Sequence, residues 1–487
     1  MYNTIYFKSF LPVLIVMIVT LFAGCNQQVN ENIERGTTYQ YREGFPEVRL
    51  SAIGLFDAEN NAGINITADI VYGSLIYSSD DNGNLEASLK AGIEIKNRNN
   101  DKTVKRKGYS FDVTAKNRTI TNSQQVFTFQ KRIPISPGSY NVLVTIVDES
   151  SGKKTTRKTE AFVPEFDDDT PRITTIQLLS KDVESDRPTF RPITTYDVQG
   201  KNDSLSFRFQ VTNAADDTVE VTNTLMKFRS DTSIARSMSS PDYSQGSIQY
   251  EGIEYDERTI LQENRRLIIQ PRNVIVEFKI PLPERGNYRF RATLSNRSGK
   301  TTSNSKNSMQ KARDFSIKSA NYPTPKTPRE LAGPLAYLMG EEKHDKLMSI
   351  HSPDSIKKAI DKFWLEEMKK PNVAKDVIAK YYERVEEANK QFSNFKEGWK
   401  TDTGMIYILF GPPFYVDDFN VDEMQWSYSY NRDEFESNYF FFQPTLENKH
   451  FPFQHYILNR DQDYFNIVFR QRKNWKTGDI LTQPLPY

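Results

Sequence analysis

The sequence predicts a multidomain chain in which two tandem β-sandwiches precede a helical segment and a C-terminal α+β domain. Three observations support this prediction. A chain of 487 residues is too long for one hydrophobic core. Two segments are rich in β-branched and aromatic runs and share an internal repeat. After Pro328 the apolar residues change to helical spacing.

The N-terminus has the pattern of an export signal. Residues 10–24 form an apolar run that is short for a membrane-spanning helix, which needs about 20 residues, and is typical of a signal peptide. The run ends in LFAGC (21–25), which resembles the lipobox of bacterial lipoproteins. This resemblance implies that residues 1–24 are removed and that Cys25 receives diacylglycerol and palmitate-type acyl chains. The alternative is a signal peptide followed by a chance cysteine.

Cys25 is the only cysteine, which excludes a disulfide within the chain. The polar residues 25–45 are expected to form a flexible tether between the lipid and the first folded domain. We therefore expect attachment to the outer membrane, with the periplasmic and the surface face left as alternatives.

The two β-rich segments span residues 46–165 and 172–320. Within them, residues 126–156 align with residues 274–302: each has a strand, Ile-Pro, Gly-x-Tyr, an alternating strand and Ser-Gly-Lys at a hairpin. This pattern indicates a duplicated domain.

The Gly-x-Tyr sequences resemble the tyrosine corner of immunoglobulin-like and fibronectin-like sandwiches. The resemblance implies that Tyr140 and Tyr288 are structural, each with its hydroxyl bonded to nearby backbone. The predicted fold class is therefore two immunoglobulin-like or fibronectin-like β-sandwiches, followed by the helical and α+β parts.

One loop has part of a calcium-binding pattern. Asp80, Asn82, Asn84 and Glu86 alternate as at the start of an EF-hand loop, but Leu85 stands where such a loop requires glycine. An Asn-Gly hairpin turn explains the stretch better. We predict no metal site and no cofactor.

The helical segment covers residues 325–397. Thr327 to Glu330 form a capping box with proline at the first helical position, and Pro353 begins a second helix. A third helix is expected over about 373–392, with Glu383, Glu386 and Glu387 on a solvated flank. The apolar faces of the second and third helices comprise Ile356, Ile360, Phe363, Trp364, Met368, Val373, Val377, Ile378, Tyr381, Val385, Ala388 and Phe392.

Several motifs then occur in order: FW (363–364), YYERVEEANKQF (381–392), GWKTD (398–402), GMIYILFGPP (404–413) and EMQWSY (423–428). Together they resemble the GWxTD domain family of exported bacterial proteins, over about residues 325–487. The resemblance implies no particular reaction.

Residues of the GWKTD stretch have structural interpretations. Gly398 is expected to take a positive φ in a helix-to-strand connection, and Trp399 to anchor the preceding helix on the following sheet. Thr401 and Asp402 are expected to bond backbone amides in the turn before Gly404. Catalysis by Asp402 is the alternative, although no base or nucleophile accompanies it in the sequence.

The run MIYILF (405–410) is continuously apolar and predicts a buried central strand, ended by Gly411, Pro412 and Pro413. Residues 398–487 are expected to form an aromatic-rich α+β domain, with strands at 437–444 and 463–470. The aromatic residues there are assigned to the core; the alternative is that some rings face outward and bind a partner or a glycan.

Function is predicted to be non-enzymatic. The sequence lacks Gly-x-Ser-x-Gly, His-Glu-x-x-His and phosphate-binding glycine loops, and the spacings of His344, His351, His450 and His455 place no pair on one helical turn. Balanced charge, 64 basic against 63 acidic residues, gives no reason to expect nucleic acid. We expect a lipid-anchored binding or scaffolding subunit with a protein partner. The alternatives are a surface glycan-binding lipoprotein and a carboxylate-based hydrolase.

Overall fold

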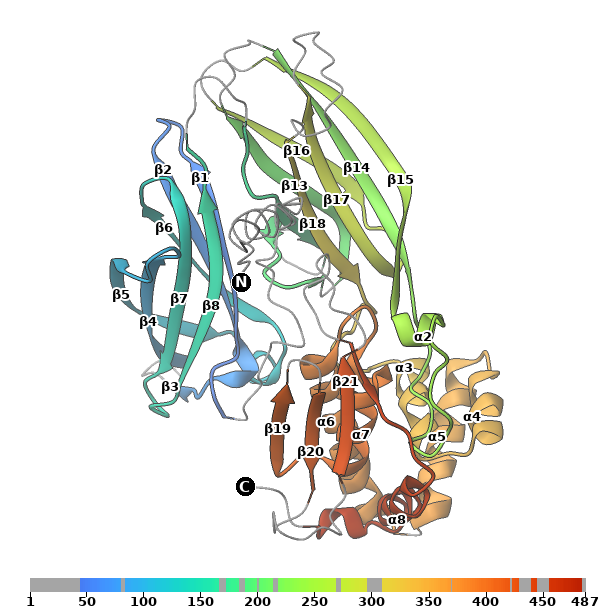
Figure 1. Ribbon diagram of the computed structural model, residues 1–487. Coiled ribbons are helices and arrows are strands. Elements are labelled where there is room, and N and C mark those ends of the chain that lie inside the picture. Colours follow the sequence, from blue (N-terminus) through green and yellow to red (C-terminus); the bar gives the residue numbers. More distant parts are fainter. Residues whose placement is uncertain are drawn as a thin grey trace, which may run out of the picture.

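The computed structural model describes residues 44–79, 84–165, 172–183, 189–198, 201–212, 218–268, 273–295, 309–368, 370–420, 423–428, 439–444 and 455–483. Cys25, the predicted signal peptide and most of the predicted tether lie outside these residues. The chain is multidomain and strand-rich: two β-sandwich-like domains precede a helical segment and a small sheet (Figure 1). In the described residues, no helix has the length and apolar character that crossing a membrane requires.

The first β-domain consists of two packed sheets. One sheet has the order β1-β2-β6; in the other, β3-β4-β7-β8 form a path and β5 pairs with β4. The core between them comes from alternate strand residues such as Leu50, Ile64, Leu89 and Val142, none of which is exposed. The strands are β1 (Val48–Phe56), β2 (Ala62–Val71), β3 (Ser78–Ser79), β4 (Leu85–Asn97), β5 (Thr103–Ala115), β6 (Val126–Pro134), β7 (Gly138–Asp148) and β8 (Lys154–Val163), with short 3₁₀ turns η3 (Tyr72–Ser74) and η4 (Ile120–Asn122).

The β3–β4 connection is a hairpin, because Ser79 pairs with Leu85 in antiparallel register. Asp80 and Asn82 of the calcium-like pattern lie outside the described residues.

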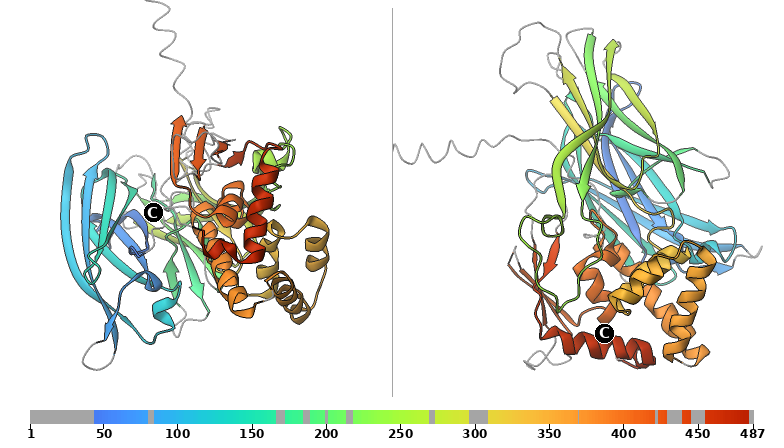
Figure 2. Two further views of the ribbon diagram at one scale, coloured as in Figure 1. Left: turned by 90° about the horizontal axis from the view of Figure 1, so that it is seen from below. Right: turned by 90° about the vertical axis from the view of Figure 1, so that its right-hand side faces the viewer.

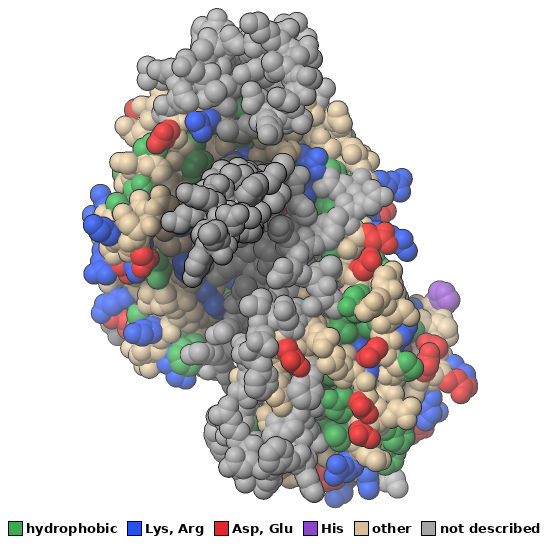
Figure 3. Space-filling view, viewed as in Figure 1, with side chains coloured by type: hydrophobic (Ala, Val, Ile, Leu, Met, Phe, Trp, Pro, Cys, Tyr) green, Lys and Arg blue, Asp and Glu red, His purple; other side chains and the backbone are tan. Residues whose placement is uncertain are grey.

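Strand β5 is an exposed edge. Among the described strands, β4 is its one partner, and Lys105, Arg106 and Lys107 are exposed near its start. Basic side chains gather along this left-hand border of the molecule (Figure 3). Charges on an edge strand oppose pairing with a second chain.

The second β-domain also packs two sheets around one core. The first sheet has the order β11-β10-β13-β16 with β9 paired to β13, and the second has the order β12-β18-β17-β14-β15. At its centre Phe207 stacks on Phe290 and meets Phe315 at a tilt of 51°, and none of the three rings is exposed. The strands are β9 (Arg172–Ile173), β10 (Gln177–Asp182), β11 (Phe190–Pro192), β12 (Asp197–Val198), β13 (Asn202–Thr212), β14 (Thr218–Ser230), β15 (Ile253–Ile268), β16 (Asn273–Pro281), β17 (Gly286–Ser295) and β18 (Met309–Ile317).

The aligned repeats have the same local geometry. In each, a strand of one sheet crosses to the other sheet through a glycine with positive φ: Gly138 at 150° and Gly286 at 154°. The hydroxyl of Tyr140 donates to Ser136 O and that of Tyr288 to Glu284 O, both at 2.7 Å. These are the backbone bonds that the Gly-x-Tyr pattern implies. The second Ser-Gly-Lys lies outside the described residues.

The C-terminal part packs helices against one another and against the sheet β19-β20-β21-β22. The predicted capping box is present, since Thr327 Oγ1 accepts from Glu330 N and the Glu330 carboxylate accepts from Thr327 N. The elements are α3 (Pro328–Ala332), η5 (Gly333–Tyr337), α4 (Glu341–Met348), α5 (Pro353–Met368), α6 (Pro371–Phe392), η6 (Gly398–Lys400), α7 (Asp402–Phe410), β19 (Tyr415–Asn420), β20 (Glu423–Ser427), β21 (Tyr439–Pro444), β22 (Tyr456–Leu458), α8 (Tyr464–Thr477) and η7 (Asp479–Leu481).

Two strand predictions were wrong. The run MIYILF lies in helix α7, and residues 463–470 begin helix α8. An apolar run has no period that separates a buried strand from a buried helix, and α7 is buried from Asp402 to Leu409. Gly411, Pro412 and Pro413 therefore end a helix rather than a strand.

Other side chains also differ from expectation. Glu386 and Glu387 were placed on a solvated flank, but both are only partly exposed. Glu386 accepts from Thr324 Oγ1 at 2.6 Å and Glu387 from the Tyr407 hydroxyl. Between β18 and α3, the Tyr322 hydroxyl is buried and donates to Asn389 O at 2.7 Å. Helix α6 thus holds its neighbours through polar side chains.

The second β-domain sends one long connection into the C-terminal part. Residues 231–252, between β14 and β15, include α2 (Ile248–Glu251) and run down over the helices (Figures 1 and 2). Ala235 and Met238 of this 231–252 insertion belong to the C-terminal core. The C-terminal core is therefore completed by a segment from the preceding domain.

Candidate functional site

The GWKTD stretch connects α6 to α7, and its backbone lies in close contact with neighbouring backbone. A Cβ atom on Gly398 would lie 1.9 Å from Ala388 O, and one on Gly404 would lie 1.9 Å from Gly398 O. Gly398 belongs to η6 and is not among the residues with positive φ. The prediction of a positive φ at Gly398 was therefore wrong: close backbone approach, not φ, requires glycine at both positions.

Thr401 is the N-cap of α7. Its Oγ1 accepts from Gly404 N at 3.0 Å and donates to Gly398 O at 2.7 Å. The hydroxyl thus satisfies one unpaired amide of the first turn and fixes the preceding 3₁₀ turn. The hydrogen bond from the backbone amide of Gly404 is the kind of contact expected for Thr401.

Trp399 packs sideways onto the start of the helical segment. Its ring would lie 3.0 Å from a Cβ on Gly333 and meets Tyr337 edge-on at 6.3 Å between centroids. The Tyr337 hydroxyl donates to Trp399 O at 2.6 Å, and Trp399 N donates to Asn389 Oδ1 at 3.1 Å. Trp399 therefore joins η5 to α6; the expected contact with a following sheet is wrong because a helix follows.

Asp402 forms a buried ion pair with Arg460. Its Oδ1 accepts from Arg460 Nη2 at 2.6 Å, and its Oδ2 accepts from Arg460 Nη1 at 3.0 Å and from Leu458 N at 2.9 Å. The Asp402 and Arg460 side chains are 4% and 0% exposed. Asp402 was expected to bond amides of its own turn; it instead holds the end of β22 against α7.

The insertion closes over this ion pair. The Tyr243 ring lies 4.3 Å from the Arg460 guanidinium, and Arg460 N donates to Asp242 Oδ1 at 3.0 Å. Burial opposes the charged form of Arg460, but the Asp402 carboxylate outweighs it and raises the pKa of Arg460. Burial, with Asp402 nearby, raises the pKa of Tyr243 to about 12. Both groups keep one protonation state at neutral pH.

A second buried pair lies beside the first. Lys396 donates to the Asp231 carboxylate and, at 3.1 Å, to Ser233 O. Burial lowers the pKa of Lys396, and Asp231 partly offsets this. Burial of Asp231 raises the pKa of this carboxyl, but the charge of Lys396 and its hydrogen bond oppose that effect, and the pKa of Asp231 is lowered. The Lys396–Asp231 pair attaches the insertion just before the GWKTD stretch, and Asp242 and Tyr243 of the insertion contact the arginine that pairs with Asp402 at the end of that stretch.

His455 is buried next to Lys396 and is neutral. Its Nε2 lies 3.3 Å from Gln249 O in the insertion, and its Nδ1 lies 3.4 Å from Asn394 Nδ2. Burial and the charge of Lys396 lower the pKa of His455 to about 4. A neutral imidazole that donates from Nε2 and accepts at Nδ1 fits both neighbours.

Side chains from α6 and α8 bind a backbone carbonyl oxygen at the C-terminal end of α7. The Arg384 guanidinium donates to Leu409 O at 3.3 Å, and the same oxygen accepts from Gln471 Nε2 at 2.7 Å and Trp475 Nε1 at 2.9 Å. Gly411 follows with φ of 88°, and a Cβ there would lie 2.7 Å from an Arg384 nitrogen. These contacts replace the missing helical bonds at this end.

The Asp402 carboxylate is used by internal contacts. Both oxygens of Asp402 already accept hydrogen bonds, and the group is almost completely buried. Among the described residues, no three His, Cys, Asp or Glu side chains are grouped to hold a metal ion. The sequence interpretation missed Arg460, Lys396, Asp231 and Tyr243, which carry no local pattern; Arg460 is 58 residues from its partner.

Comparison with known proteins agrees with the motif. Residues 300–477 match the GWxTD domain family. No curated protein matches the chain. Similar solved structures include red sea bream transglutaminase (9% identity, TM-score 0.18, covering 57% of this chain and 32% of that one) and dimeric latent PorU from Porphyromonas gingivalis (11%, TM-score 0.23, 57% and 20%). A mutant Salmonella alpha-2-macroglobulin is also similar (13%, TM-score 0.19, 59% and 17%).

The chain thus spans about a third or less of the length of each of these proteins. The C-terminal part of this chain is a GWxTD domain.

Proposed function

We propose that this protein is a lipid-anchored component of the cell envelope and acts as a non-enzymatic binding or scaffolding subunit of an outer-membrane assembly. Two immunoglobulin-like or fibronectin-like domains would hold the GWxTD domain away from the anchor; the bonds of Tyr140 and Tyr288 support this assignment. The observation that carries the proposal is a pair of exposed phenylalanines on α8.

Phe465 and Phe469 are the most exposed large apolar side chains described, at 60% and 61%. Their rings stack with centroids 6.3 Å apart and planes 17° apart. The opposite face of α8, with Tyr464, Val468 and Trp475, is buried in the core. The two rings therefore face solvent, and adjacent exposed aromatic rings are typical of a binding surface.

The two rings are flanked by basic residues on their C-terminal side. Arg470 and Lys473 are exposed there, whereas the exposed Asp461 and Asp463 lie before the helix. Arg472 and Lys476 are held by Tyr337 O and Glu367. A partner with an apolar groove and an acidic rim would complement this surface.

A non-enzymatic role fits the use of the GWKTD residues. Their side chains are engaged in internal contacts that join the insertion, α6, α7 and β22. Such a unit is suited to present α8 in one fixed orientation. The Asp402 carboxylate, the acid that the motif offers, is paired with Arg460.

Site-specific photo-cross-linking in the native cell tests the binding surface. A photoreactive phenylalanine analogue at position 469 should give a discrete adduct with an envelope protein. The matched control is position 275, because Ile275 is 59% exposed but lies on β16 of the second β-domain. Adducts from 469 that carry polysaccharide or phospholipid instead of protein, or identical adducts from both positions, would contradict the proposal.

The lipid anchor needs a separate test. Intact-mass measurement should show loss of residues 1–24 and added acyl mass on Cys25. Cys25→Ala should lose the acyl mass. A wild-type chain that begins at Cys25 but carries no acyl mass would refute lipidation at this position.

A further inference from the structure

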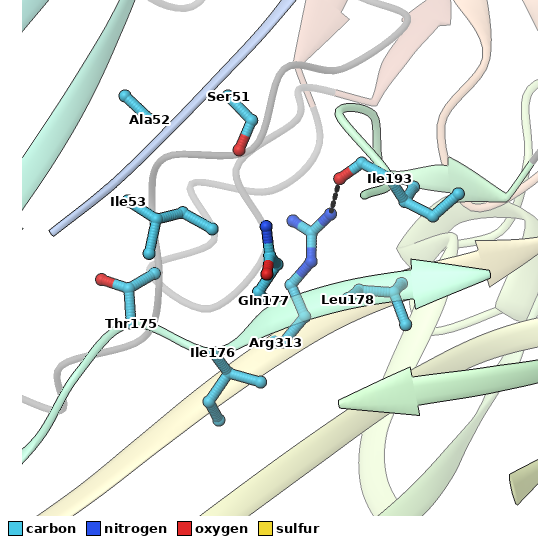
Figure 4. Close-up of a pocket in the computed structure, with 9 residues that line it drawn as sticks. All are labelled: Ser51, Ala52, Ile53, Thr175, Ile176, Gln177, Leu178, Ile193 and Arg313. Carbon is cyan, nitrogen blue, oxygen red and sulfur yellow. Dashed lines mark hydrogen bonds between the residues drawn. The ribbon is translucent and has the colours of Figure 1, made fainter. Parts of the chain in front are cut away.

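The two β-domains enclose a small pocket where they meet. It is lined by Ser51 and Ile53 of β1, by Gln177 of β10 and by Ile193, with Arg313 of β18 at one side. Figure 4 shows these side chains converging from the two domains. The space open to the centre of a water-sized sphere is about 10 Å³, which suits one small occupant.

Arg313 is a buried cation without an acidic partner in the described structure. The residue is 5% exposed, and its Nη2 donates to Thr195 O at 3.0 Å and Ile193 O at 3.4 Å. The adjacent Asp314 carboxylate is taken by Arg289, at 2.8 and 2.9 Å. Two carbonyl oxygens leave most of the five guanidinium N–H groups unused.

The charge of Arg313 persists at neutral pH. Burial lowers the pKa of Arg313 to about 10, and Asp314 and Tyr196 partly oppose that change. Lys311, two residues earlier on β18, adds a second cation, 5.2 Å from the Phe162 ring of the first domain. A buried charge is costly unless a counter-charge or several hydrogen bonds compensate it.

Neutral donors face the same space. Figure 4 shows the Ser51 hydroxyl and the Gln177 amide on the pocket side, toward the Arg313 guanidinium. Within the described residues, neither side chain has a hydrogen bond to another group. Ile53 of β1 adds an apolar side chain to this lining, whereas Ile176 and Leu178 on either side of Gln177 belong to the core of the second β-domain.

We propose that Arg313, Ser51 and Gln177 bind one monatomic monovalent anion, chloride under ordinary conditions, between the two β-domains. The guanidinium supplies the charge, the hydroxyl and the amide supply neutral N–H and O–H donors, and the small volume excludes polyatomic anions. A partly apolar wall suits a weakly hydrated halide better than a strongly hydrated ion.

The bound anion would stabilise the domain contact. That contact already includes Phe56 N to Gln210 Oε1 at 2.8 Å, Gln210 Nε2 to Phe56 O at 2.7 Å and Thr194 Oγ1 to Asp69 Oδ2 at 2.8 Å. The pocket lies along the same boundary, so an anion held from both sides adds a further link between β1 and β18.

Calorimetry of the chain from Asn26 onward tests the proposal. Chloride is titrated at constant ionic strength, with gluconate as the balancing anion. A tenfold excess over the dissociation constant should lower the unfolding equilibrium constant of the β-domains about tenfold. Arg313→Gln should lose this chloride response, and Ser51→Ala should weaken it. Arg208→Gln, at a partly exposed ion pair with Glu277, should retain the full response.

Bromide gives a direct readout that does not depend on variant stability. Crystals of the wild-type chain grown in bromide should show one anomalous peak between Ser51 and Arg313. Absence of that peak, or a chloride response equal in wild type and Arg313→Gln, would overturn the proposal and leave the pocket as a water site.

Discussion

The buried pair of Asp402 and Arg460 predicts a specific pattern of stability losses. Arg460→Met leaves the Asp402 carboxylate buried without its cation, and Asp402→Asn leaves the guanidinium buried without its anion. Because both side chains are almost unexposed, each single change should cost about 3–5 kcal/mol of unfolding free energy. This exceeds the roughly 1 kcal/mol that loss of a capping side chain would cost.

The double variant Asp402→Asn with Arg460→Met should be more stable than either single variant. It contains no unpaired charge, and the asparagine oxygen can still accept from Leu458 N. A cost of about 1–3 kcal/mol remains, from polar groups that lose their partners. The double-mutant cycle therefore separates an ion pair from two independent effects.

Tryptophan fluorescence during urea unfolding measures these differences. All four tryptophans, Trp364, Trp399, Trp426 and Trp475, lie in the C-terminal part, so the signal reports on this domain alone. The full chain is required, because a fragment that starts at residue 325 lacks Ala235 and Met238 of the core. The linear dependence of free energy on urea gives each value.

A surface pair supplies the control. Lys362 and Glu366 lie 3.6 Å apart with side chains 72% and 66% exposed, so Glu366→Gln should change stability by less than about 1 kcal/mol. The reasoning is refuted if Asp402→Asn is as stable as wild type, or if the double variant is no better than the singles. An unchanged stability together with loss of a defined activity would instead identify Asp402 as catalytic.

Three further predictions concern other positions. Gly404→Ala should cost at least about 1–3 kcal/mol, because the new Cβ meets Gly398 O; Gly340→Ala, where no atom lies within 4 Å, should be near neutral in the same urea assay. His455 has a pKa of about 4 in the folded protein against about 6.5 unfolded, so the unfolded chain takes up the proton first. Acidification from pH 7 to below 4 should therefore lower the free energy of unfolding by about 3 kcal/mol. Urea titrations at several pH values should show that this free energy falls less steeply with acidification in His455→Gln than in wild type. Tyr288→Phe removes the bond to Glu284 O and should cost about 1 kcal/mol, seen by calorimetry as a lower transition temperature; an unchanged transition would contradict a structural role.

Local patterns in the sequence predicted much of the helical segment. The capping box at Thr327, the proline at 353 and the apolar spacing of Ile356, Ile360 and Trp364 depend on neighbours within one or two helical turns, and the structure confirms them. The duplicated strand pattern likewise predicted two strand-rich regions, because side-chain alternation is a property of each strand by itself.

The elements that the sequence interpretation missed lack such a signal or had one that was overlooked. Helix α7 is buried on every side, so its apolar run shows no period. Helix α8 does show one, since Tyr464, Val468 and Trp475 recur at helical spacing and face the core, but its aromatic content favoured a strand.

The sequence by itself determined where helices begin, where apolar faces lie and which motif the C-terminal domain carries. Only the tertiary structure decided what that motif contacts. Asp402 meets Arg460 across 58 residues, Lys396 meets Asp231 across 165, and the 231–252 insertion completes a core that begins a hundred residues later. These contacts form because separate elements pack together and must pair the charges that they bury, and no spacing along the chain records such a pairing.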